Sequence, residues 1–522
     1  MRMHRLGLAC VSMSVVLSGC ADGEPNNGES LQDNQRPVSQ NSTSGSSEVD
    51  GPDAVLVTHT ERFHTSVGIA VRSKDLSSSP PELLVRTSTG FTPVTGAPHA
   101  GGYRFLGVPQ GEYYLKTGSN FVVTDERHVE VGQNYRGRED TVFSSVHDAD
   151  MDVALTNVAP WEDPDGSFLG SRIQLVSGQL DFVADTFLWS STLPGATHLN
   201  GHGTAYSLSN TFPAFDASKQ DGLYVNQFSS FQGAQLPTGA PLVGETLSRS
   251  LALPYFDYTP GVSPVLTVSG AMQAVPTEGF SLEWRLANYP AQALAIHPNA
   301  TARAPSFTIS PAPHSPASSS VGYAGEVFNF TLPAGANFTL TDQLTYGNPY
   351  PSSWQMVGIA HYPFAFSETA PGASRARTLS GAIASWDTLD SLVASPVEPK
   401  LTPAGALAID GIAATTQREV SNSSPLITWT PPVTGAPNAY RVLLKRYNVS
   451  NATLWVQNQF YLPGTASELR IPAGVLAPGA VYALTVTAID SPNADVTREP
   501  FTVIDQLPLH MADTLSSFFT TP

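Results

Sequence analysis

From about Ala54 onward, the sequence consists of short runs in which apolar and polar residues alternate, separated by turns rich in Pro, Gly, Asn and Ser. Because successive side chains of a strand point to opposite faces of a sheet, this period of two predicts strands with one buried face. No apolar stripe with the helical period is longer than two turns. Charged residues make up 13% of the chain, against about 25% on average, so long salt-bridged helices are not expected. The pattern predicts an all-β protein with several β-sandwich domains in a row.

The first 19 residues have the composition of an export signal. Two arginines precede an apolar run that is shorter than the about 20 residues needed to cross a membrane. The next residues, Leu17-Ser18-Gly19-Cys20, resemble the lipobox of bacterial lipoproteins. The resemblance implies removal of residues 1–19, lipidation of Cys20 and, because Ala21 and not Asp follows, anchoring in the outer membrane, facing the periplasm or the cell surface. Ordinary secretion with cleavage after Ala21 is the alternative.

Residues 20–53 are expected to form a disordered acidic tether between this anchor and the folded part. Seven acidic residues and one Arg lie in 21–53, with hardly a large apolar side chain, so the segment cannot bury enough surface to offset its chain entropy. The two cysteines, Cys10 and Cys20, leave the processed chain without a disulfide or a Cys metal ligand. The formal net charge of −18 argues against nucleic acid as a partner, because phosphate binding needs clustered Lys and Arg.

The segment 54–140 is predicted to be the first folded domain. Its residues 102–115 read GYRFLGVPQGEYYL. Tyr103 and Phe105 fall on one face of a strand, a turn follows, and Tyr113 is expected to return on the same face. The motif resembles the end of a carboxypeptidase regulatory-like (transthyretin-like) β-sandwich, an accessory module that implies no peptidase activity. An unrelated hairpin is the alternative.

The segment 396–521 contains two motifs in the order expected of a second sandwich. PLITWTPP places Trp429 on one face of a strand, and LAPGAVYALTVTA places Tyr482 at the start of another. Together they resemble a fibronectin type III domain. The resemblance implies that Trp429 fills the core and that the Tyr482 hydroxyl bonds back to upstream backbone. Because the segment exceeds the about 100 residues of such domains, we expect an insertion at 491–509, before the last strand.

Between these segments, residues 141–395 resemble no family. They are expected to form either one large sandwich or two smaller ones. The clearest strand candidates are Ile173–Leu180, Val265–Met272, Phe280–Leu286, Ser306–Ile309, Glu326–Leu332, Trp354–Ala360 and Thr378–Trp386.

Catalytic and cofactor motifs are missing from the sequence. It contains no G-x-S-x-G, H-E-x-x-H or G-x-x-x-x-G-K-[ST]. A carboxylate pair for glycoside hydrolysis is not testable by sequence, because such partners meet only in space. We therefore assign no catalytic residue, no cofactor and no metal ligand.

Two short stretches nevertheless concentrate polar groups. Asp148, Asp150 and Asp152 match the first three ligand positions of an EF-hand loop, but the required Gly and Glu further on are Val and Ala. A solvated acidic linker is the favoured interpretation, with a different kind of Ca²⁺ site as the alternative. His198 and His202 have the spacing of a zinc pair on a helix, but the glycines around them favour a polar surface loop. Of the seven tryptophans, Trp429 is expected in a core by its motif, and the others are expected in cores, with a sugar-stacking platform as the alternative.

These observations favour a lipid-anchored cell-envelope protein with a non-catalytic binding, adhesion or scaffolding role. The membrane is a partner through the lipid, and a polysaccharide or a surface protein is the expected ligand. Two alternatives remain, namely an extracellular polymer hydrolase with its catalytic centre in 141–395 and a structural spacer. The hydrolase requires a concave pocket in which titratable side chains converge.

Overall fold

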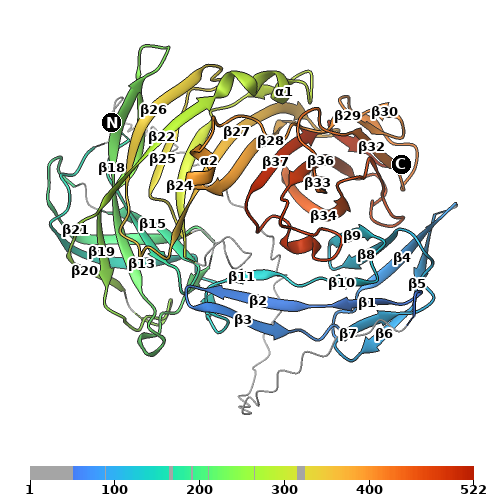
Figure 1. The fold of residues 1–522 in the computed structure, drawn as a ribbon, viewed down its shortest axis with the longest axis horizontal. Helices are drawn as coiled ribbons and strands as arrows, with labels where there is room; N and C mark the ends of the chain where they lie inside the picture. Colours follow the sequence, from blue (N-terminus) through green and yellow to red (C-terminus); the bar gives the residue numbers. More distant parts are fainter. Residues whose placement is uncertain are drawn as a thin grey trace. The chain divides into compact units, whose positions relative to one another are not determined.

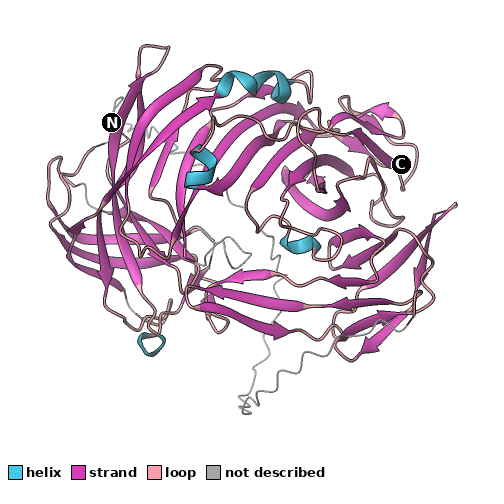
Figure 2. Cartoon of the chain, in the orientation of Figure 1, coloured by secondary structure: helices cyan, strands magenta, loops and turns pink. Residues whose placement is uncertain are grey.

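The computed structural model describes residues 51–522 apart from 89, 164–168, 190–191, 210, 264 and 314–323. Cys20 and nearly all of the tether segment lie outside the described residues. Strands dominate the described chain, and the few helices are one or two turns long (Figures 1 and 2). The all-β prediction is confirmed. Within the described residues, the model contains no helix with the length and apolarity of a membrane span. Residues 48–522 form one compact unit.

Residues 55–136 form a two-sheet sandwich and a separate three-stranded sheet with the order β11-β2-β3. One sheet has the order β10-β1-β7-β6, and the facing strands are paired in the order β5-β4-β8-β9. Val57 and Phe105 from the first sheet meet Leu83, Leu115 and Val122 from the second in a buried core. The strands are β1 (Val55–Thr58), β2 (Thr60–Thr65), β3 (Gly68–Ser73), β4 (Glu82–Thr87), β5 (Gly90–Val94), β6 (Gly96–His99), β7 (Gly102–Phe105), β8 (Tyr113–Thr117), β9 (Asn120–Thr124), β10 (His128–Glu130) and β11 (Asn134–Arg136).

The alternative interpretation of residues 102–115, an unrelated hairpin, is wrong. β7 pairs with β1 and β6, whereas β8 pairs with β4 and β9 in the opposite sheet. The connection is longer than the two to five residues of a hairpin loop, and it buries Val108 in the core while it crosses between sheets about 10 Å apart. Phe105 and Tyr113 therefore face each other across the core.

In the first half of the central region, strand pairing runs in a closed circuit. It leads from β13 through β16, β15, β14, β18 and β19 to β21, and β20, one residue before β21, pairs back with β13. The apolar side chains of these strands share one inner core, which includes Met151, Leu175, Ala205 and Val225. The elements are β12 (Phe143–Ser144), β13 (Asp148–Thr156), β14 (Arg172–Ser177), β15 (Phe182–Leu188), β16 (His198–Ser207), β17 (Phe212–Pro213), η1 (Ala217–Lys219), β18 (Leu223–Gln235), β19 (Pro241–Leu253), β20 (Leu266–Ala271) and β21 (Gln273–Ala274).

The second half adds a layer continuous with β19. Pairing continues through β25, β24, β27 and β28, and the antiparallel pair β22–β26 packs over it, with Phe280 and Trp284 against Phe307. Each of the seven candidate strands overlaps an observed strand. The elements are β22 (Thr277–Arg285), η2 (Leu286–Asn288), α1 (Pro290–Leu294), β23 (Thr301–Ala302), β24 (Ser306–Ala312), β25 (Phe328–Thr331), β26 (Thr339–Gly347), β27 (Gln355–Thr369), β28 (Ala376–Thr388) and α2 (Leu389–Val393).

The C-terminal segment is a second two-sheet sandwich. The sheet β30-β29-β32-β35 faces strands paired in the order β34-β33-β36-β37. Trp429 is buried with its ring centroid 5.3 Å from that of Tyr440, and the Tyr482 hydroxyl accepts a 2.9 Å hydrogen bond from the backbone N–H of Ala477. Both expected roles are confirmed. The elements are β29 (Gly405–Ile409), β30 (Ile412–Ala413), β31 (Arg418–Glu419), β32 (Leu426–Thr430), β33 (Ala439–Asn448), β34 (Thr453–Pro463), β35 (Glu468–Arg470), β36 (Val481–Asp490), η4 (Pro500–Thr502), β37 (Leu509–Leu515) and β38 (Phe519–Thr520).

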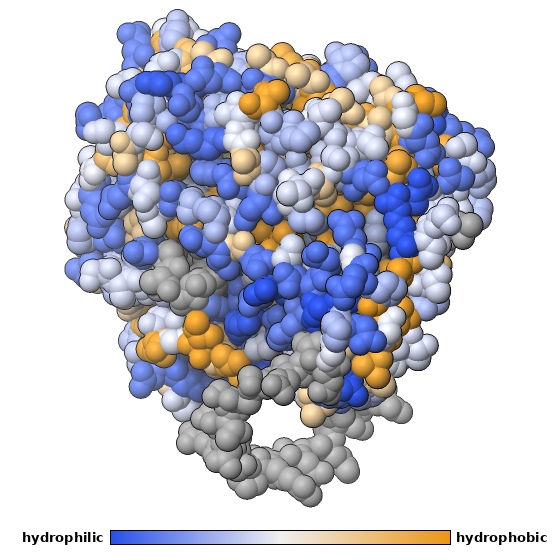
Figure 3. Space-filling model, turned by 45° about the vertical axis from the view of Figure 1, so that its right-hand side comes forward, coloured by the Kyte–Doolittle hydropathy of each residue, from blue (hydrophilic) through white to orange (hydrophobic). Residues whose placement is uncertain are grey.

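Sheets continue across the boundaries between these segments. β28 of the central region pairs with β37, and β9 of the N-terminal sandwich pairs with β34 (Figure 1). Residues 491–508, where an insertion is expected, connect β36 to β37 and contain only η4; this connection is called the insertion before β37. On the face drawn in Figure 3, hydrophilic residues are interspersed with small groups of hydrophobic ones, as on an ordinary water-exposed surface.

Candidate functional site

The two polar stretches of the central region lie side by side on paired strands. β13 and β16 are antiparallel, with Asp152 opposite His202 and Asp148 opposite Tyr206. Nδ1 of His202 donates a short hydrogen bond to Oδ1 of Asp152. The interpretation of 148–152 as a solvated linker is therefore wrong, and so is that of 198–203 as a loop.

The physical reason for β13 lies in the residues between the aspartates. Ala149, Met151 and Val153 point into the inner core, so the aspartates point outward at every second position. In β16, Gly203 serves packing and not a turn. A Cβ at this position would lie 2.6 Å from the backbone oxygen of Phe187, so only glycine lets β15 approach so closely.

Exposed aromatic side chains lie beside these polar groups. Phe187, Trp189 and Tyr206 are 60%, 58% and 41% exposed. Phe187 lies on β15 directly opposite Thr204 of β16. We call the outward side chains of β13, β15 and β16, together with Trp189, the outer face. Four of the seven tryptophans are buried in cores, as expected, and these are Trp284, Trp354, Trp386 and Trp429.

Trp189 is held in place although it is exposed. Its Nε1–H donates a 2.9 Å hydrogen bond to Oγ1 of Thr204, and its backbone N–H donates to the carbonyl of His202. Its ring centroid lies 6.2 Å from that of His202. Further along the chain, Gly195 and Ala196 each form a backbone hydrogen bond with Trp161. Little side-chain freedom therefore remains to be lost when a ligand binds.

Acceptors and negative charge prevail on the outer face. Asp148 and Asp150 make no ion pair within the described part of the chain. Near the first residues of β16, a recess of about 10 Å³ lies beside Asn200, Gly201 and His202. This volume has room for about one water molecule. None of the outward positions of β13, β15 and β16 carries Lys or Arg.

Arg172 on β14, the strand that pairs with β15, is already neutralised. Its Nε, Nη1 and Nη2 groups lie 2.8, 3.2 and 3.1 Å from carboxylate oxygens of Glu245, Asp185 and Glu326. Its guanidinium also lies 3.9 Å from the ring centroid of Phe228. Burial, the largest cause, raises the pKa of Glu326. This cluster connects β14, β15, β19 and the segment just before β25. Sequence reasoning did not find it because its members are far apart in the chain.

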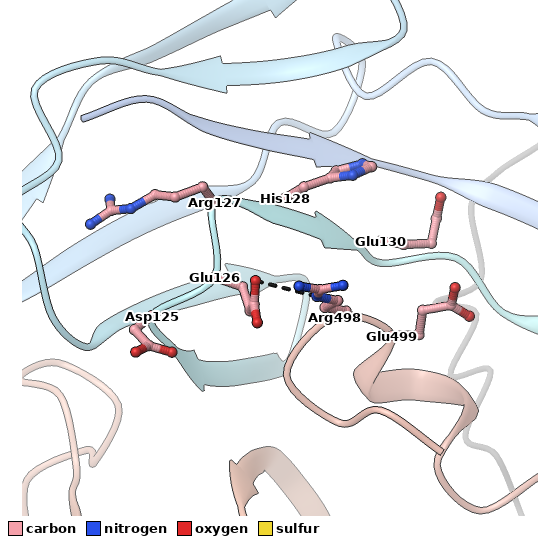
Figure 4. Close-up of a pocket in the computed structure, with 7 residues that line it drawn as sticks. All are labelled: Asp125, Glu126, Arg127, His128, Glu130, Arg498 and Glu499. Atoms are coloured by element: carbon pink, nitrogen blue, oxygen red, sulfur yellow. Dashed lines mark ion pairs between the residues drawn. The ribbon is translucent and has the colours of Figure 1, made fainter. Parts of the chain in front are cut away.

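A larger cleft, of about 530 Å³, lies at the junction of β9 and β10 with the insertion before β37 (Figure 4). Glu126 points toward Arg498, with 3.3 Å between carboxylate and guanidinium, whereas Arg127 points away and donates to two backbone carbonyls. Glu130 accepts hydrogen bonds from Thr58, Thr60 and Gly132. Glu126, Arg127 and Glu130 therefore bind other parts of the same chain.

Within the described residues, no group of three or more His, Cys, Asp or Glu side chains is arranged to hold a metal ion. The outer aspartates are spread along a strand, so they do not surround a common point. Cys20, the predicted lipidation site, lies outside the described residues.

Comparison with known proteins yields little. No family model matches the chain, and no curated protein matches it. Among solved structures, the crystal structure of the chicken CNTN1 FN1-FN3 domains matches with 10% identity, covering 73% of this chain and 98% of that chain, at a TM-score of 0.13. This similarity to fibronectin type III domains is weak.

Proposed function

We propose that the protein is a lipid-anchored component of a bacterial cell envelope with a non-catalytic binding role, exercised by the outer face. The observation that carries this proposal is the combination, on rigid paired strands, of exposed Phe187, Trp189 and Tyr206 with outward carboxylates. Exposed aromatic residues on a fixed scaffold are typical of recognition surfaces, because they offer large contact area at low entropic cost.

Binding is favoured over polymer hydrolysis by the surroundings of these groups. A hydrolase needs a concave pocket where titratable side chains converge. The recess near the first residues of β16 has room for about one water molecule, and His202 is the one titratable side chain that lines it. The larger cleft is formed by 125–130 and 498–499, outside the region in which a catalytic centre was expected.

The flanking segments fit this role as accessory modules. We propose that 396–521 is a fibronectin type III-like sandwich, supported by the core position of Trp429 and the Tyr482 hydrogen bond. For 54–140, the two-sheet core supports a regulatory-like sandwich. Modules of this kind commonly present a binding region away from the membrane, which is an argument from fold alone.

The binding role is tested on a glycan and polymer array with purified full-length protein and a Trp189→Ala variant. Binding to at least one polymer, reduced in the variant, is expected. Equal binding by both proteins would show that the outer face is not the binding surface.

The anchor is tested separately by a Cys20→Ala variant. Lipid labelling should be lost and the protein should leave the membrane fraction, because the lipid is the proposed attachment. Unchanged partitioning would contradict the anchor without affecting the outer face.

A further inference from the structure

We propose that the ligand of the outer face is a non-acidic glycan, whose sugar rings stack on Trp189 and its aromatic neighbours while hydroxyl or amino groups donate to the carboxylates of β13. This inference rests on the proposed binding function and adds the chemical class of the ligand.

The first step concerns shape. The outer face is built on a sheet, with Tyr206 on β16 and with Phe187 on β15 and Trp189 just after β15 lying beside it. The distance from His202 to Tyr206, four residues along the strand, is about 13 Å, which matches an extended oligosaccharide. Phe187 lies opposite the midpoint of this stretch, at Thr204, and Trp189 is bonded to the same Thr204.

The second step concerns the contact between rings. A pyranose ring has a face of C–H groups that packs on an aromatic ring much as an aliphatic side chain does, so stacking buries apolar area without removing the hydroxyls from water. Trp189 suits this contact because hydrogen bonds hold both its indole nitrogen and its backbone N–H, while 58% of the residue stays exposed.

The third step concerns charge. Asp148, Asp150 and Asp152 lie beside the aromatic side chains, and the outward positions of β13, β15 and β16 carry no Lys or Arg. Carboxylates accept hydrogen bonds from sugar hydroxyls and pair with amino groups, but they repel uronate or sulfate groups. Arg172 on the neighbouring strand β14 is surrounded by three carboxylates and is not available to an acidic sugar.

The closing experiment measures affinity of the full-length protein for three probes: chitosan oligosaccharides with free amines, neutral cello-oligosaccharides and polygalacturonate. The first two should bind and polygalacturonate should not. Trp189→Ala should weaken binding roughly tenfold. The matched control is Trp455→Ala, which removes a tryptophan that is 40% exposed on β34 and should bind like the unmodified protein.

A variant with both Asp148→Asn and Asp150→Asn separates charge from stacking. It should lose affinity for the amine-bearing probe and keep most of its affinity for the neutral one. Binding of polygalacturonate at least as tight as that of the other probes would overturn the ligand class. Equal losses of affinity in the Trp189→Ala and Trp455→Ala variants would do the same, and so would a failure to bind any of the three probes. The proposed binding function falls only if, in addition, Trp189→Ala leaves binding on the wider array unchanged.

Discussion

At the scale of single residues, the chain uses its few charges where they connect strands. Arg172 is the clearest example, because its carboxylate partners come from three separate parts of the chain: Asp185 from β15, Glu245 from β19 and Glu326 from the segment just before β25. Asn329 donates to both glutamates. One guanidinium faces three carboxylates, so its removal leaves negative charges close together and partly shielded from water.

Arg172→Met should therefore destabilise the protein by about 3 kcal/mol, at the low end for broken buried ion pairs because the four side chains keep some contact with water. The measurement is the urea midpoint followed by tryptophan fluorescence. The matched control is Arg285→Met, whose partners Glu283 and Glu398 are well exposed and whose loss should cost less than about 1 kcal/mol. Equal midpoints for the two variants would contradict the role of the cluster.

Asp505 in the insertion before β37 makes stability depend on pH. Burial raises its pKa to about 6, while the 3.1 Å hydrogen bond from Nδ2 of Asn134 acts in the opposite direction. In the unfolded chain the pKa returns to about 3.9, so the folded state binds the proton more readily. The stabilisation that comes from protonation of Asp505 in the folded state is therefore lost as pH rises from about 4 to 6.

An Asp505→Asn variant should thus melt at a higher temperature than the unmodified protein at pH 7.5, and the two should melt alike at pH 4. The amide accepts the same hydrogen bond from Asn134, so only the charge changes. Thermal melts at the two pH values measure this, and an advantage of the same size at both would show that burial of the charge is not its cause.

At the scale of elements, the sequence predicted which segments are strands better than it predicted what they pair with. The alternation of apolar and polar residues in 306–309 and 378–386 was sufficient to predict these two strands, because the local sequence alone determines which side chains face inward. β13 and β16 were misread because aspartates and glycines are rare in strands. The apolar Ala149, Met151 and Val153 between the aspartates were the signal that could have found β13.

The outer face could not be predicted, for a physical reason. Its members come from three strands, and Phe187 meets Thr204 only through the register of β15 on β16. A shift of one residue would turn every side chain to the other face. The sequence contains Trp189 and Phe187 but nothing that states whether they point inward or outward.

Gly203→Val tests whether close packing of β15 on β16 requires glycine. Because a Cβ would lie 2.6 Å from a backbone oxygen, the strands must separate, at a cost of about 1–3 kcal/mol. Binding at the outer face should weaken as well, since Trp189 and Thr204 lose their register. Asn200→Val, at an exposed outward position of the same strand, should change stability by less than about 0.5 kcal/mol. If both variants unfold at the same denaturant concentration, the packing argument fails.

At the scale of the whole molecule, the insertion before β37 joins the first and last sandwiches. The carbonyl of Arg498 accepts from the N–H of Glu130, that of Thr497 accepts from Oγ1 of Thr124, and Asp505 bonds Asn134. From there the chain continues into Arg136 and Arg138, which pair with Asp181 and Asp221 of the central region. Three segments remote in sequence are thereby connected around β11.

Phe501 is the apolar part of this junction. Its ring lies 5.2 Å from that of Tyr461 on β34, and its side chain also packs against the core of the N-terminal sandwich. Phe501→Ala should leave each sandwich folded, because neither core is built around this side chain, but it should loosen the contact between them. Hydrogen exchange at β9 and β10 should accelerate while that at β32 and β36 stays unchanged.

Trp455→Ala, on the same strand as Tyr461 but exposed, is the control and should alter hydrogen exchange at neither pair of strands. Faster exchange throughout the C-terminal sandwich would instead mean that Phe501 supports the domain itself, and that the two sandwiches are held together by the β9–β34 pairing and the polar contacts alone.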